Sequence, residues 1–133
     1  TTEIYTLSLH DALPILWCER RAGSAFTELC IRHGDFAVVA AAAQVALDDD
    51  GRCVRAAFGL AAVGQTPLAF PKLAAGLVGS SLTEDLVRET AKSAADECEP
   101  GSDLHASAEY RHHLAGVLAA QALHAAHEKA KAA

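Results

Sequence analysis

The 133-residue sequence has few aromatic side chains, no long apolar run and no run of basic residues. No uninterrupted apolar stretch reaches about 18 residues, the length that a membrane-spanning helix needs, so no membrane span is expected. Eleven Lys and Arg against 17 Asp and Glu give a net charge of −6. Without a basic run the chain lacks a surface that displaces counterions from phosphates, which excludes nucleic acid as a partner.

Cysteine pairs and convergent metal ligands are also missing. The four cysteines lie at positions 18, 30, 53 and 98, and none forms a C-x-x-C pair. This spacing is typical of reduced thiols in a cytoplasmic protein rather than of a disulfide framework or a zinc site. His105, His112 and His113 are expected on different sides of a helix start, whereas metal ligands must converge. We therefore expect a single cytoplasmic domain without a metal site of its own.

The first fifteen residues are expected to have a technical origin. A common short-read sequencing adapter encodes residues 1–15 without a mismatch, and their apolar positions keep neither a helical nor a strand period. We interpret residues 1–15 as translated adapter and exclude them from the fold, as one excludes a fusion scar. Residues 16–133 are then the natural domain, and the gene sequence before Leu16 is expected to be missing.

Two strands joined by a tight turn are predicted in the first half of the chain. Residues 36–47 are rich in Val and Ala and uncharged, which fits a buried strand and a buried helix equally well. The Asp-Asp-Asp-Gly sequence at 48–51 is a strong turn, and residues 52–63 alternate, with Val54 on the apolar face and Cys53 on the other. Because an alternating strand after a hairpin turn needs an antiparallel partner, residues 36–47 are predicted to be that strand.

Capping residues and apolar spacing predict the remaining elements. These are a short helix at 24–29 capped by Ser24 and stopped by Gly34, an edge strand at 68–70, a brief helix from Pro71, a helix that starts at Thr83 and ends before Pro100, and a long helix at about 106–130. The apolar stripe of the long helix is expected at Tyr110, Leu114, Val117, Leu118, Gln121 and Ala125. The predicted fold class is α+β: an antiparallel β-hairpin or three-stranded sheet, covered on one face by two or three helices.

Motifs that carry catalytic chemistry do not occur. The sequence has no Gly-x-Ser-x-Gly nucleophile elbow, and its glycines form neither a Gly-x-Gly-x-x-Gly nor a Walker run for phosphate. Cys53 lies between Arg52 and Arg55, but its place within a strand favours a small buried apolar side chain over a reactive thiol. We predict no catalytic residue in this chain.

Several polar segments do resemble a known family when they are taken in order. These segments are SAFTE at 24–28, RHGDFA at 32–37, the Asp-Asp-Gly turn, VGQTP at 63–67 and SDLHASAEYRHHL at 102–114. They resemble the C-terminal domain of the FAD-binding medium subunit of molybdenum hydroxylases, the aerobic carbon monoxide dehydrogenase and xanthine dehydrogenase group. The similarity covers nearly all of residues 16–133.

That resemblance implies a part in electron transfer. Subunits of this family bind FAD and receive electrons from a molybdenum-cofactor large subunit through a 2Fe–2S small subunit, then pass them to an acceptor. The Gly-rich loops that hold the FAD pyrophosphate belong to the preceding domain, so FAD is expected to be bound mainly outside residues 16–133. The resemblance therefore implies an oxidoreductase subunit with two partner subunits, and a chain that is not active alone.

The resemblance also implies which residues lie near the flavin. Residues 26–35 are the stretch in question, and Glu28, Arg32 and Asp35 are the candidate cofactor-binding residues. Family members often carry a basic residue near position 27 or 28 and an Arg pair where this chain has Ile31 before Arg32. A cation near a flavin favours its reduced anionic form, so that contribution is expected here from Arg32 alone. From the residues alone, Arg32 and Asp35 are predicted to form an ion pair at the surface, which would contribute less than ~1 kcal/mol to stability.

The polar residues at 102–111 are expected to have structural roles. Asp103 or Ser107 can cap the last helix, and Arg111 can reach an acid or a backbone carbonyl, which assigns these residues to structure.

Two other functions are weighed against the flavoprotein interpretation. The alternative function is a non-enzymatic α+β protein-interaction module whose Ala-rich helix docks on a partner. An independent small enzyme is disfavoured because no catalytic set converges. An upstream FAD domain in the gene would support the flavoprotein interpretation over both.

Overall fold

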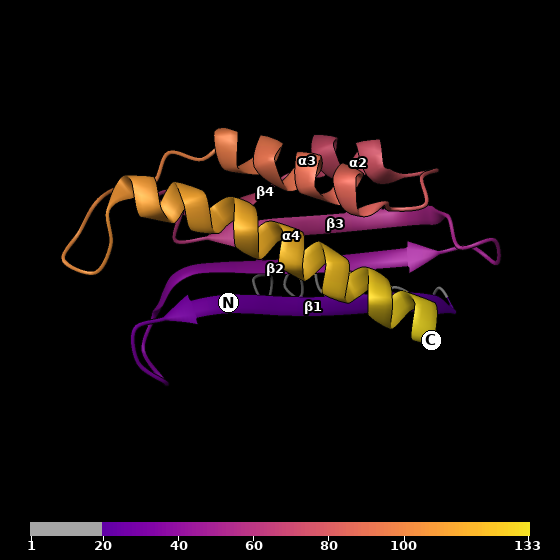
Figure 1. The fold of residues 1–133 in the computed structure, drawn as a ribbon, viewed down its shortest axis with the longest axis horizontal. Helices are drawn as coiled ribbons and strands as arrows, with labels where there is room; N and C mark the ends of the chain where they lie inside the picture. The colour runs from indigo at the N-terminus through magenta and orange to yellow at the C-terminus, as the bar shows by residue number, and fades with distance from the viewer. Residues whose placement is uncertain (1–19) are drawn as a thin grey trace, which may run out of the picture.

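A computed structural model describes residues 20–133, in which a sheet forms one layer and helices the other (Figure 1). The elements are β1 (Arg21–Cys30), β2 (Ala37–Leu47), β3 (Cys53–Ala61), β4 (Leu68–Ala69), α2 (Pro71–Leu77), α3 (Glu84–Asp96) and α4 (Ala108–Ala132). The sheet has the order β1-β2-β3-β4 with every neighbouring pair antiparallel. The α+β prediction is confirmed, with four strands in place of two or three.

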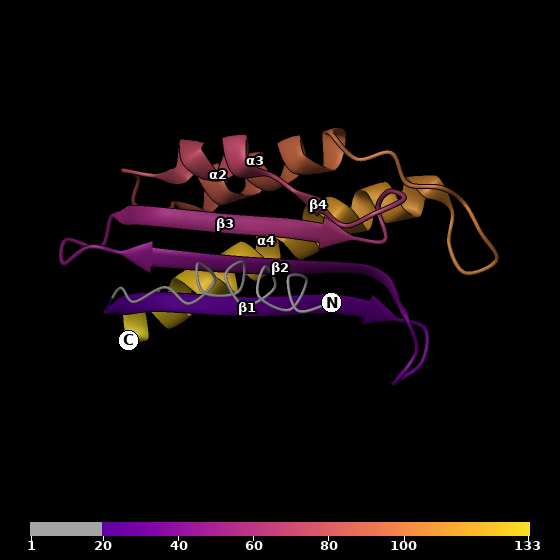
Figure 2. The same cartoon turned by 180° about the vertical axis from the view of Figure 1, so that it is seen from behind.

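All three described helices lie on the same face of the sheet. Figure 1 shows them in front of the strands, and Figure 2 shows the strands from the opposite side with the helices behind. The hydrophobic core fills the space between the layers, where Val39, Val45 and Leu60 of the sheet are almost fully buried with Leu77 and Leu123 of the helices. The second face of the sheet is covered by no helix of residues 20–133.

The predicted helix at 24–29 is wrong, because these residues belong to strand β1. The side chains of β1 alternate, with Gly23 and Ala25 toward the helices and Ser24 and Phe26 away from them. Pairing with ten residues of β2 supplies the backbone hydrogen bonds that a short isolated helix would lack. Ser24 pairs with Gln44 in the middle of this ladder, so its side chain caps nothing.

The central hairpin is confirmed, with one change of face. β2 and β3 pair antiparallel through the turn at 48–51, where Gly51 has a φ of +80° and the Arg52 N–H donates to Asp48 Oδ1 at 2.8 Å. The register shifts between Ala46 and Leu47, next to the turn. This bulge turns Cys53 into the core at 1% exposure and leaves Val54 44% exposed, the reverse of the expected alternation.

The long helix α4 packs on β1 and β2 through a face of alanines together with Leu114, Leu118 and Leu123. Tyr110 and Val117 of the expected stripe are 47% and 38% exposed, whereas Ala115, Ala119, Ala122 and other alanines are buried. The alanines let the helix axis come close to the sheet. At the closest point, a Cβ added to residue Gly23 would overlap the backbone of Ala126 and Ala130 in α4.

This close approach predicts a strong effect of a single methyl group. Gly23→Ala should destabilise the chain by about 3 kcal/mol, because helix backbone atoms cannot move aside as a flexible side chain could. Gly76→Ala is the matched control, since a Cβ there meets nothing within 4 Å and the helical residue should gain roughly 0.5–1 kcal/mol. Urea unfolding measures both; equal midpoints for the two variants would contradict the packing described here.

Candidate functional site

A buried guanidinium joins the loop before α4 to the sheet. The Arg111 side chain is 10% exposed, and its Nη1 donates to Val38 O of β2 at 2.7 Å and to Ala62 O at 3.2 Å. Its Nη2 donates to Asp103 Oδ2 at 2.6 Å. The predicted structural role of Arg111 is thereby confirmed, with both kinds of partner, the acid and the backbone carbonyl.

Asp103 fixes the loop that carries Arg111. Its Oδ1 accepts the N–H of His105 at 2.8 Å and of Ala106 at 3.0 Å. These backbone hydrogen bonds, with the bond from Arg111, lower the pKa of Asp103 from 3.8 to about 2. The helix itself is capped by Ser107, whose hydroxyl accepts the Tyr110 N–H at 3.1 Å. The cap therefore belongs to Ser107, and Asp103 serves the turn and the ion pair.

Arg111 also holds a strained backbone in place. Ala62 has a φ of +64°, a left-handed conformation that costs a non-glycine residue about 1–2 kcal/mol. The hydrogen bond from Arg111 to the Ala62 carbonyl offsets part of this cost. Nε of Arg111 is buried without a partner among the described residues, so the two Nη atoms make the bonds. The cluster has the connections of a structural clasp. A cavity of about 290 Å³ lies beside it, and its lining includes Asp35, Phe36, Asp103, His105 and Arg111.

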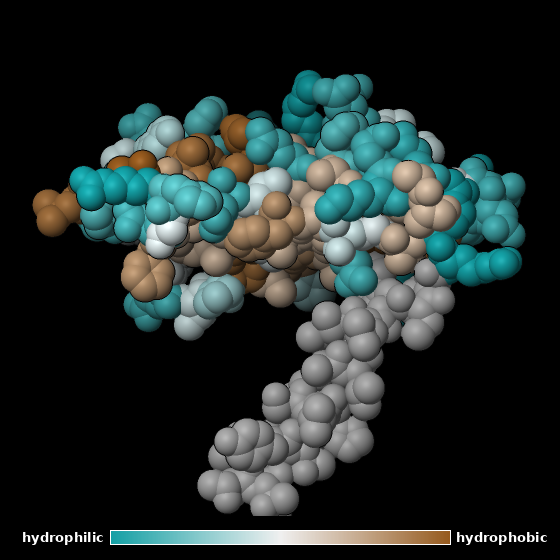
Figure 3. Space-filling model, turned by 90° about the horizontal axis from the view of Figure 1, so that it is seen from below, coloured by the Kyte–Doolittle hydropathy of each residue, from teal (hydrophilic) through white to brown (hydrophobic). Residues whose placement is uncertain are grey.

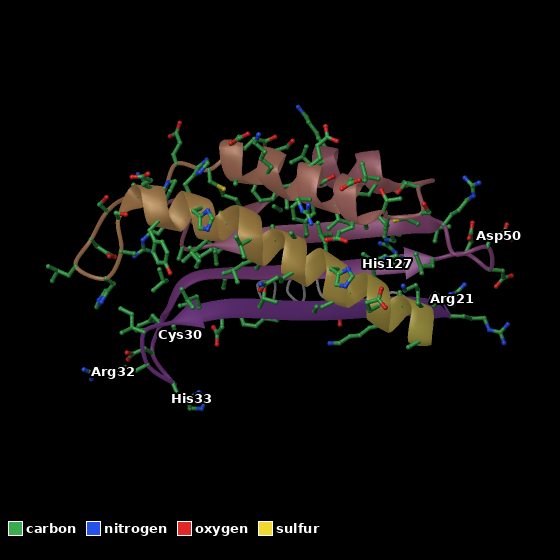
Figure 4. All side chains as sticks on the ribbon, viewed as in Figure 1. Arg21, Cys30, Arg32, His33, Asp50 and His127 are labelled. Atoms are coloured by element: carbon green, nitrogen blue, oxygen red, sulfur yellow. The ribbon has the colours of Figure 1, made fainter. Side chains whose placement is uncertain are left out.

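The residues predicted to bind cofactor lie at one end of β1 and in the loop that follows it. Glu28 is exposed on β1, and Arg32 and Asp35 are exposed in the loop, where the Asp35 N–H donates to Arg32 O at 3.1 Å. Figure 4 shows Arg32 and His33 projecting away from the body of the protein beyond Cys30. Within residues 20–133, no ion pair joins Arg32 to Asp35. The structure gathers the three residues at this end without converging them on one point.

Cys30 lies beside the two carboxylates of this group. Partial burial raises the pKa of its thiol, as do the charge of Glu28, a hydrogen bond with Glu28 and the charge of Asp35. The thiol is therefore held protonated and is a poor nucleophile. Glu28 and Asp35 are acids and Arg32 is the one cation among the predicted cofactor-binding residues. This charge balance suits a ligand group that donates hydrogen bonds better than it suits a negatively charged phosphate.

The helix-free face of the sheet is built from small residues. We call it the open face: Ala22, Ser24, Phe26 and Glu28 of β1, Ala40, Ala42, Gln44 and Ala46 of β2, Arg55, Ala57, Gly59 and Ala61 of β3, and Ala69 of β4. A shallow hollow of about 650 Å³ lies over its middle. Figure 3 views the molecule from the β1 edge of the sheet, where apolar side chains lie among hydrophilic ones. Phe26 of the open face is 64% exposed.

Residues 24–126 match the family described as the CO dehydrogenase flavoprotein C-terminal domain. The chain belongs to this family. The carbon monoxide dehydrogenase medium chain of Afipia carboxidovorans is 35% identical over 109 residues, which cover 82% of this chain and 38% of the relative. The 6-hydroxypseudooxynicotine dehydrogenase complex subunit alpha of Paenarthrobacter nicotinovorans is 34% identical over 90 residues, covering 68% and 30%. The chain thus spans about a third of the length of these curated relatives.

Solved structures of CO dehydrogenase flavoprotein relatives share the fold. Carbon monoxide dehydrogenase from Hydrogenophaga pseudoflava matches with a TM-score of 0.78 and 29% identity over 83% of this chain and 38% of its own. Quinoline 2-oxidoreductase from Pseudomonas putida matches with a TM-score of 0.77 and 32% identity over 82% and 38%. The relatives are subunits of oxidoreductases, and the family predicted from the sequence is confirmed.

Two absences among the described residues bear on the site. Among residues 20–133 no helix is long and apolar enough to cross a membrane, and no group of three or more His, Cys, Asp and Glu is placed to hold a metal ion. Cys18 and the proposed adapter segment at 1–15 lie outside the described residues.

The open face of this flavoprotein domain is the feature that the sequence interpretation missed. The signal for it was the alternation of Gly23, Ala25 and Thr27 with Ser24 and Phe26, which was hidden by the helix-like cap at Ser24. The hydroxyl of Thr27 confirms the inward face, because it donates to Leu118 O of α4 at 3.1 Å. Because residues 21–30 form strand β1 at the edge of the sheet, the open face is four strands wide instead of three.

The Asp103 pair predicts a pH dependence of stability in this domain. Because folding lowers the pKa of Asp103, its stabilising contribution is complete above the ordinary value of 3.8 and is lost as pH falls toward 2. Asp103→Asn should therefore be less stable than the unchanged chain at pH 7, and the difference should shrink between pH 4 and pH 2. Urea unfolding across this range measures it. A difference that stays constant with pH would contradict the charge-assisted bond to Arg111.

Proposed function

We propose that residues 16–133 are the C-terminal domain of a FAD-binding subunit in a molybdenum-dependent hydroxylase or dehydrogenase. The observation that carries the proposal is the family match over residues 24–126, together with 35% identity to a carbon monoxide dehydrogenase medium chain. In such an enzyme the subunit relays electrons from molybdenum and 2Fe–2S centres through FAD to an acceptor. The domain contributes a scaffold beside the flavin and no catalytic residue.

The chemistry of the described residues is consistent with a secondary contact to FAD. Glu28, Arg32 and Asp35 give one cation and two acids, so they do not fit the FAD pyrophosphate, which would be held by an upstream part of the subunit. Carboxylates can accept hydrogen bonds from the N–H edge of a flavin ring, and Arg32 can stabilise negative charge on a reduced flavin. When bound, FAD supplies the electron relay; these residues adjust its electrostatic surroundings.

The proposed partners are a molybdenum-binding large subunit and an iron–sulfur small subunit, in a cytoplasmic complex. One relative carries the name of a complex subunit and another that of a medium chain, which supports membership in a multi-subunit assembly. The gene neighbourhood tests this part directly: adjacent genes for molybdenum and iron–sulfur subunits are expected.

If the upstream part of the subunit holds the FAD pyrophosphate, this domain alone should not bind FAD tightly. The 133-residue chain should show no micromolar affinity for FAD, because it holds no phosphate-binding loop, whereas the complete subunit should retain FAD through gel filtration. Flavin fluorescence on titration measures both. Micromolar binding by the 133-residue chain alone would show that this domain, and not an upstream part, is the main FAD site.

The charge of Arg32 predicts a shift in flavin potential. In the complete subunit, Arg32→Gln should lower the midpoint potential by about 10–30 mV, because a cation that favours the reduced anion is removed. Lys72→Gln is the matched control, since it removes one positive charge from the exposed helix α2 on the far side of the sheet. Spectroelectrochemical titration separates the two; equal potentials for both variants would place Arg32 away from the flavin.

A further inference from the structure

One row of side chains crosses the whole open face in register. Phe26 of β1 pairs with Ala42 of β2, Ala42 pairs with Gly59 of β3, and Gly59 pairs with Ala69 of β4. All four residues point away from the helices, because their neighbours Ala25, Ala43 and Phe58 point toward them. The row is a floor of three small residues with an aromatic wall at the β1 end.

This row is apolar and accessible. Within the row, Ala42 and Ala69 are exposed although they lie in a sheet, and Phe26 is 64% exposed. Ala57 is exposed in the next row, whereas Ala40 and Ala46 elsewhere on the open face are buried. The polar side chains of Ser24 and Gln44 occupy only the next row toward the turn at 48–51. With strands about 4.8 Å apart, four strands give a face roughly 14 Å wide, large enough for an apolar patch of a few hundred Å². A patch of this size on a sheet is typical of a covered interface rather than of a surface in water.

The length of the relatives indicates what covers it. This domain occupies 30–38% of their chains, and the matching family is a C-terminal domain, so most of each relative precedes it. In this chain the preceding segment joins at the start of β1, the edge strand of the open face. A domain attached there can reach the face without a linker, whereas the opposite face is already filled by α2, α3 and α4.

From this placement, and resting on the proposed function, we infer that the upstream, flavin-binding part of the same polypeptide docks on the open face. Phe26 is the anchor that inserts into the docked part, and the small floor at Ala42 and Gly59 lets backbone or flat side chains approach closely. Contact along β1 then continues from Phe26 to Glu28 and into the 31–36 loop. The docking would bring the proposed cofactor-contacting residues to the rim of the same interface.

A photo-crosslinking side chain tests the occupant directly. In the complete subunit, p-benzoylphenylalanine at position 42 should cross-link within one polypeptide to the upstream part, and mass spectrometry identifies the linked peptide. The same group at position 75 is the control, because Ala75 is exposed on helix α2 in the opposite layer. A cross-link from position 42 to a second copy or to another subunit would overturn the inference, as would no cross-link in a FAD-loaded subunit.

A charge on the floor gives an independent measure. Ala42→Glu and Ala57→Glu should each weaken FAD retention in the complete subunit at least tenfold, whereas Ala75→Glu should leave it unchanged. Thermal unfolding of the 133-residue chain controls for misfolding: the alanines are exposed, so all three variants should melt near the unchanged chain. Unaltered FAD retention in both floor variants would overturn the inference and leave the proposed function standing. An unchanged complete subunit that binds no FAD would instead contradict the proposed function.

Discussion

The fold depends on one buried cation that is shared between distant parts of the chain. Arg111 lies near the start of α4, yet its bonds go to Val38 at the start of β2, to Ala62 just after β3 and to Asp103 in the preceding loop. A planar group with several fixed donors can hold three segments at once, which a lysine could not do in the same geometry. The clasp sets where α4 begins, and the alanine face of the helix then follows β1 to Gly23.

That arrangement leaves the molecule with two unlike sides. The helix layer encloses one face of the sheet. The other face has mostly small side chains and an exposed Phe26, with Glu28 and Arg55 toward its ends. The small, exposed side chains at its centre suit an interface, and the proposed function supplies an upstream flavin-binding part of the same chain as the occupant.

The sequence predicted the hairpin, the helices α2, α3 and α4 and the fold class, because turn residues, caps and helical spacing are local signals. The family was predicted from the order of several polar segments that resemble it. It failed for β1, where Ser24 and an acid four residues later imitate a helix start while ten pairings with β2 decide the outcome. It also misplaced Cys53 and Val54, since a bulge at Ala46 and Leu47 cannot be read from alternation. For the candidate site, the structural roles of Arg111 and Asp103 were predicted from their side-chain chemistry and their place just before and within the last helix. The open face depends on registers between four strands and could only come from the fold.

The central claim is that this domain closes over a flavin-binding part through the bare side of its sheet. A crystal structure of the complete subunit with FAD tests it most directly. The account predicts that the row from Phe26 to Ala69 is buried against the upstream part of the same chain, with the flavin ring at the end of β1 beside residues 26–35. A structure in which that row faces solvent and the flavin lies against the helix layer would contradict it.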